Sequence, residues 1–90
     1  MISRTSKAFR ERFRQLPKDV QRQAGVAYRL WKQNPQHPGL HFKRAHPTDP
    51  IYSVRIGRGW RALGLQRDHE RMVWFWIGSH ADYDRLLSEL

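Results

Sequence analysis

Four side chains in the second half of the chain are suited to chemistry on a phosphate group. Arg55 and Arg61 stand on either side of the turn Gly57-Arg58-Gly59, and a guanidinium group binds phosphate oxygens through paired N–H donors. His80 is the candidate acid or base, because an imidazole exchanges protons near neutral pH. Tyr83 follows three residues later and either joins the same site or packs its ring under the last helix. Together these residues predict an anion-binding site that can also transfer protons.

Four further residues are candidates for binding phosphate along the same surface. They lie on the first expected strand, just after it, on the arginine-bearing strand and at the tip of the turn: Lys43, His46, Ser53 and Arg58. The histidines lack the HExxH spacing and have few acids around them, so we expect no metal. The chain also has no glycine-rich phosphate loop and no GxSxG motif. We therefore expect no cofactor, no nucleotide hydrolysis and no serine-hydrolase chemistry.

The central turn allows two strand registers, and the choice decides where the arginines lie. A two-residue turn would pair Ile56 with Arg61 and mix apolar and charged side chains on each face. A three-residue turn pairs Arg55 with Arg61 and separates an apolar face from a face that carries both arginines. Because a buried face strongly specifies register, we prefer the three-residue turn. It predicts that the two guanidinium groups converge on one hollow of the open sheet face, beside His80.

A change in hydrophobic period along the chain separates helices from strands. Apolar residues recur every three or four positions over residues 7–33, where Ser6 is the expected N-cap and Pro17 begins the second helix. Further along, the period is two, and the run 72–77 is apolar throughout, which indicates a central strand. Ser79 is the expected N-cap of a last helix. The sequence predicts an α+β fold: an N-terminal helical hairpin packed on a small antiparallel β-sheet of about four strands, with a short C-terminal helix.

Length and charge limit the class of protein. Ninety residues form one domain, residues 1–90, which is too small for a Rossmann or barrel enzyme. The chain has 17 Lys+Arg against 8 Asp+Glu, and the whole excess lies in residues 1–45, which favours a polyanionic partner. A solvated basic helix face is the alternative, and a membrane-surface helix carries less weight. The absence of cysteine and of any apolar run near about 20 residues suits a soluble cytoplasmic protein.

Three segments resemble the RelE/ParE superfamily of bacterial toxins from type II toxin–antitoxin systems. They are YSVRIG at residues 52–57, GWRALG at 59–64 and VWFWIGSHADYD at 73–84. The resemblance covers nearly the whole chain and implies a RelE/ParE-like fold. It also implies a small endoribonuclease that cleaves mRNA, usually in the ribosomal A site, and is held inactive by a cognate antitoxin.

The resemblance also implies roles for single residues. Arg61 matches the family arginine after the hairpin, which stabilises phosphate charge, and Arg55 matches a basic residue of the preceding strand. Ser53 stands where RelE has a lysine. His80 occupies the region of a RelE arginine, and Tyr83 lies near a C-terminal tyrosine with a shorter spacing. The implied reaction is metal-free phosphodiester transfer, in which Tyr83 or one of the basic residues of the first strand assists His80.

Two alternative functions share the same fold. One is a ParE-like inhibitor of DNA gyrase, and the other is a degenerate, non-catalytic nucleic-acid-binding member of the superfamily. The pairing of two arginines with a histidine favours the nuclease, because a gyrase inhibitor needs no convergent phosphate site. The expected partners are an acidic, partly disordered antitoxin, mRNA and the ribosome. We expect contact with operator DNA only through the antitoxin complex.

Overall fold

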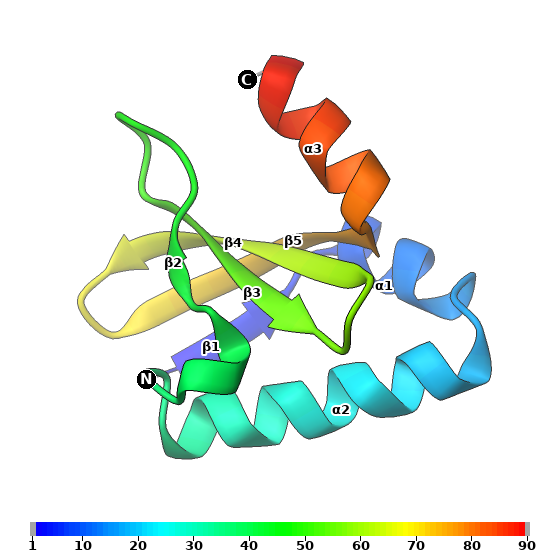
Figure 1. Cartoon of the computed structure of the whole chain (residues 1–90). Helices are drawn as coiled ribbons and strands as arrows, with labels where there is room; N and C mark the ends of the chain where they lie inside the picture. Colours follow the sequence, from blue (N-terminus) through cyan, green and yellow to red (C-terminus); the bar gives the residue numbers. More distant parts are fainter. Residues whose placement is uncertain (1, 90) are drawn as a thin grey trace.

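The computed structural model describes residues 2–89, which form a five-stranded sheet with helices on both faces (Figure 1). The strands lie in the order β1-β5-β4-β3-β2. In Figure 1, α2 runs along one face of the sheet and α3 stands on the other. In chain order the elements are β1 (Ile2–Thr5), α1 (Lys7–Arg14), α2 (Lys18–Gln33), the 3-10 helix η1 (Pro38–Leu40), β2 (Lys43–Arg44), β3 (Ile51–Ile56), β4 (Trp60–Asp68), β5 (Arg71–Ser79) and α3 (His80–Glu89).

β1 is the strand that the sequence did not predict. It pairs in parallel with β5, from Ile2 beside Arg71 to Thr5 beside Trp74, and the Ser6 N–H donates to Trp74 O at 2.9 Å where the pairing ends. The expected antiparallel sheet of about four strands is therefore a mixed sheet of five within residues 2–89. A four-residue segment with one large apolar side chain has too little alternation to indicate a strand, and its partner lies far along the chain.

The β3–β4 hairpin has the three-residue turn that the sequence predicts. Ile56 pairs with Trp60, and Arg55 pairs with Arg61. Gly57 begins the turn with a φ of 56°, a left-handed conformation that glycine adopts without strain. β5 lies between β1 and β4, so the prediction of a central strand from its apolar sequence is also confirmed.

The N-terminal helical hairpin is present and encloses a groove. Ser6 caps α1, its Oγ accepting the Phe9 N–H at 3.1 Å. α2 starts at Lys18, one residue after Pro17, and ends before Asn34, because a residue that precedes proline avoids the helical conformation. An apolar groove of about 500 Å³ lies between α1 and α2, with the sheet as its floor.

The sheet separates two apolar clusters. On the α2 side, the rings of Trp31 and Trp74 meet edge to face at 5.2 Å. On the α3 side, a second cluster contains Leu63, Trp76 and Tyr83. The face that carries the arginines was expected to be open, and α3 covers part of it instead. The cover forms because strand residues on this face and the inner side of α3 are both apolar, so their contact removes apolar area from water.

Candidate functional site

The structure turns the two paired arginines toward different parts of the molecule. The Arg55 Nε donates to Gly57 O at 2.9 Å, and Arg55 borders a shallow groove beside α2 with Arg22 and Gln23. Arg61 donates to Trp60 O at 3.0 Å. The expected convergence of the two guanidinium groups on one hollow is therefore not what the structure has. β2 pairs with β3 only as far as Ser53, so no β2 residue stands beside Arg55.

Arg61 instead forms a cluster with two residues of α3. Its Cζ lies 6.0 Å from the centre of the Tyr83 ring, a distance at which a cation is attracted to the ring face. The rings of Tyr83 and His80 have their centres 5.9 Å apart. Three of the four residues predicted to be catalytic thus lie side by side, and they come from β4 and the first turn of α3.

His80 is fixed at the point where β5 passes into α3. Its main-chain N–H donates to Gly59 O at 2.8 Å, which ties the start of α3 to the hairpin turn. The Ser79 Oγ accepts the Asp82 N–H at 3.1 Å, which confirms the predicted N-cap. The imidazole Nε2 lies 3.2 Å from Asp84 Oδ2, and the side chain of His80 is 48% exposed. His80 is therefore held in orientation while the rest of its ring remains accessible to a substrate.

Asp84 contacts this cluster and Arg12 lies near it, and neither was predicted from the sequence. Asp84 could have been found, because residues four apart on a helix are neighbours and His80 precedes it by four. Arg12 comes from α1, and its Cζ lies 5.5 Å from the centre of the Trp76 ring. The ring of Trp76 in turn lies 6.4 Å from that of Tyr83. Nothing in the local sequence around Arg12 indicates this contact.

Tyr83 adopts both positions that the sequence left open. Its ring packs in the apolar cluster beneath α3, and the residue is 6% exposed. The same ring is also within about 6 Å of both the Arg61 guanidinium and the His80 ring. Because it is so closely packed, the Tyr83 ring is a fixed surface next to the other two groups.

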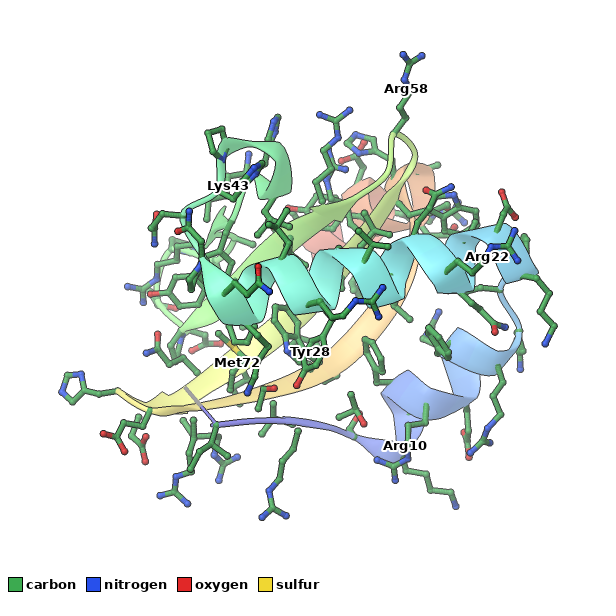
Figure 2. The ribbon with its side chains drawn as sticks, turned by 90° about the horizontal axis from the view of Figure 1, so that it is seen from below. Arg10, Arg22, Tyr28, Lys43, Arg58 and Met72 are labelled. Carbon is green, nitrogen blue, oxygen red and sulfur yellow. The ribbon has the colours of Figure 1, made fainter. Side chains whose placement is uncertain are left out.

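The four predicted phosphate-binding residues are dispersed. Ser53 is 1% exposed and lies on β3 between β2 and β4, so its side chain has no access to a phosphate and this prediction is wrong. The His46 Nδ1 accepts the Asp49 N–H at 3.0 Å and thereby shapes the loop after β2. Lys43 lies exposed on β2, and Arg58 projects from the hairpin tip away from the body of the molecule (Figure 2).

Within residues 2–89 no three His, Asp or Glu side chains are grouped so as to hold a metal ion. The same residues contain no helix long and apolar enough to cross a membrane. A shifted pKa is found at the β4–β5 turn, where hydrogen bonds from the Glu70 N–H and the Arg71 guanidinium lower the pKa of Asp68. That turn is at the opposite end of β4 from Arg61, so the perturbation has no part in the site.

Comparison with known proteins identifies the family. A family model described as the ParE-like toxin domain matches residues 18–85. The chain belongs to the ParE-like toxin domain family. The matched region runs from α2 into α3 and includes Arg61, His80 and Tyr83. A sequence comparison with curated proteins found no match.

Solved structures share the fold of this ParE-like domain at low sequence identity. The RelB–RelE antitoxin–toxin complex from Methanococcus jannaschii matches with a TM-score of 0.70 and 12% identity, over 90% of this chain and 95% of that one. The YoeB/ParE toxin from Agrobacterium tumefaciens has a TM-score of 0.69 and 12% identity, over 89% and 99%. The isolated E. coli RelE toxin has a TM-score of 0.64 and 14% identity, over 98% and 97%. The resemblance to the RelE/ParE superfamily is confirmed, and the chain is a ParE-like toxin domain with the fold of RelE and YoeB.

Proposed function

We propose that this ParE-like domain is the toxin of a type II toxin–antitoxin pair and a metal-independent endoribonuclease that cuts mRNA on the ribosome, which inhibits translation. The observation that carries the proposal is the cluster of Arg61, His80 and Tyr83 at the start of α3. A cation and a half-exposed imidazole that both lie near one tyrosine ring can supply charge stabilisation and proton transfer to the same substrate. Because the proposed substrate is mRNA on the ribosome, the proposal implies that the toxin acts in the cytoplasm.

In the proposed reaction a base removes the proton of a ribose 2′-hydroxyl, the oxygen attacks the adjacent phosphorus, and the bond to the 5′ oxygen breaks as an acid protonates it. Arg61 stabilises the negative charge that grows on the phosphate oxygens. His80 takes or gives one of the two protons. If Asp84 accepts the Nε2–H of the imidazole, Nδ1 is the atom that exchanges a proton with the substrate. Tyr83 orients both groups and is the candidate for the second proton.

The proposal includes an antitoxin with apolar and acidic residues as partner. The groove between α1 and α2 has apolar walls that include Phe9, Phe13 and Tyr28, and it is bordered by Arg10 and Arg14; Figure 2 labels Arg10 on α1 and Tyr28 on α2. An amphipathic segment with acidic flanks complements this surface in both polarity and charge. The RelB–RelE complexes among the structural relatives support such a partner, which would also carry any contact with operator DNA.

Two observations favour a second function, inhibition of DNA gyrase. The family model is ParE-like, and Arg55 lies apart from Arg61, so the site has fewer convergent cations than the sequence suggests. Induced expression of the chain in bacterial cells distinguishes the two functions. mRNA cut within codons, mapped from the 5′ ends of cellular RNA, supports the nuclease. DNA breaks with an SOS response and intact mRNA support gyrase inhibition, and unimpaired growth supports a non-catalytic member.

A further inference from the structure

α1 lies where β5 has lost its neighbouring strand. β1 accompanies β5 only as far as Thr5, which pairs with Trp74, and the Ser6 N–H makes a last bond to Trp74 O. From Phe75 onward that side of β5 is free of a strand, and α1 starts at this point with Lys7. The helix therefore reaches the half of β5 that leads to His80. Its side chains can contact the α3 face of the sheet from the edge.

On the α3 face of the sheet, Trp76 is the residue of β5 that Arg12 of α1 contacts. A Cβ on Gly78 would lie 2.7 Å from the Trp76 Cζ2, so the indole covers the main chain of Gly78. Gly78 is the residue that pairs with Arg61. The ring of Trp76 thus extends along β5 to the level of Arg61. Because residue 78 is a glycine, no side chain there separates the ring from Arg61.

Trp76 and Tyr83 form a pair of neighbouring rings, with Arg61 near the Tyr83 ring and the Arg12 guanidinium over the Trp76 ring. Its Cζ is 5.5 Å from the Trp76 ring centre, as the Arg61 Cζ is 6.0 Å from the Tyr83 ring centre, and the two rings are 6.4 Å apart. Arg12 is exposed. Among residues 2–89 its guanidinium makes no hydrogen bond and no ion pair, whereas Arg10 on the same helix donates to Thr5. A ring face orients a guanidinium and leaves the N–H edge available for an anion.

We propose that Arg12 is a second phosphate-binding arginine of the site, which holds a phosphate of an RNA strand that neighbours the one held by Arg61. The proposal rests on the proposed function, because it takes the strand to be the substrate. The chemistry favours a nucleic-acid strand over an acidic protein here. A nucleic-acid strand carries one phosphate per nucleotide, so successive phosphates can reach both Arg12 and Arg61. The same surface also carries His80. Arg14, two residues along α1, borders the apolar groove instead, which is the surface suited to a protein segment.

Binding of a short 2′-O-methyl oligoribonucleotide tests the role of Arg12 independently of cleavage, because this probe lacks the attacking hydroxyl. Fluorescence anisotropy of a labelled probe is measured for the full chain and for three variants. Arg12→Gln should weaken binding about 5- to 10-fold and reduce the slope of log K against log salt by about 0.7. Arg12→Lys keeps the charge and should fall between Arg12→Gln and the original chain. Arg14→Gln is the matched control and should change the affinity less than about twofold.

Equal affinity of Arg12→Gln and the original chain would overturn the proposal. So would equal losses in Arg12→Gln and Arg14→Gln, because net charge alone would then explain the binding. If Arg12→Gln instead lost affinity for a labelled acidic peptide and kept its affinity for the oligoribonucleotide, Arg12 would belong to a protein-binding surface. That result would also overturn the proposal. If Arg12 governs binding of the probe but the original chain leaves unmodified mRNA uncut, the RNA site stands and the proposed catalysis fails.

Discussion

Gly78 belongs to the segment that carries the family resemblance, yet the structure assigns it a packing role. An added methyl group would lie 2.7 Å from Trp76 Cζ2 and 2.8 Å from Cη2. The indole has little freedom to move aside, because Trp76 is 6% exposed and packs against Tyr83. Gly78→Ala is therefore overpacked, and overpacking of this kind costs about 1–3 kcal/mol.

Gly59→Ala is the matched control for this substitution. Its Cβ would meet no atom within 4 Å, and its φ is not positive, so the change should be neutral or stabilise by about 0.4–1 kcal/mol. Thermal unfolding followed by circular dichroism compares the two. For a domain of this size each kcal/mol shifts Tm by about 4–8 °C, so Gly78→Ala should unfold roughly 5–20 °C lower than the original chain. Equal Tm values for the two alanine variants would refute the assigned packing of Trp76 over Gly78.

Three other predictions follow from single contacts. Asp84→Asn should lower RNA cleavage several-fold while Tm stays within about 3 °C, because the residue orients His80 from the exposed side of α3; unchanged cleavage would contradict this. Phe13→Glu, in the wall of the α1–α2 groove, should leave cells sensitive to the toxin but unprotected by coexpressed antitoxin, and intact protection would exclude the groove as the docking surface. The lowered pKa of Asp68 contributes stability that is present at pH values above its ordinary pKa of 3.8 and is lost as the pH falls through the lower folded pKa. Asp68→Asn should therefore flatten the pH dependence of urea unfolding below about pH 4. An identical pH dependence in the variant would argue against the bonds to Glu70 and Arg71.

The parts of the fold that depend on local pattern could be predicted from the sequence. The β3–β4 register followed from an apolar face and a glycine turn, and it places Arg55 opposite Arg61 as expected. The caps at Ser6 and Ser79 followed from hydroxyl side chains placed just before an amphipathic run. In each case the determining residues are close together in the chain, so short-range geometry was sufficient.

The parts that depend on distant contacts could not be predicted. β1 exists because the edge of β5 accepts it, and the sequence of residues 2–5 contains no indication of that edge. Arg55 bonds to the carbonyl of Gly57 in the hairpin turn, a contact that the register alone does not indicate. Arg12 lies over Trp76 because α1 follows β1 along β5, which requires the strand order to be known. Register could thus be predicted, whereas the direction of long flexible side chains could not.

The central claim is that Arg61 acts on a phosphate beside His80, and cleavage of mRNA by a ribosome-bound toxin tests it most directly. Purified ribosomes programmed with a defined mRNA are incubated with the original chain, with Arg61→Ala and with Arg67→Ala, a control on the exposed far end of the same strand. We predict that Arg61→Ala cleaves at least about a hundredfold more slowly, whereas Arg67→Ala stays within about twofold of the original chain. Equal cleavage by Arg61→Ala and the original chain, with both variants folded, would contradict the assignment of this site.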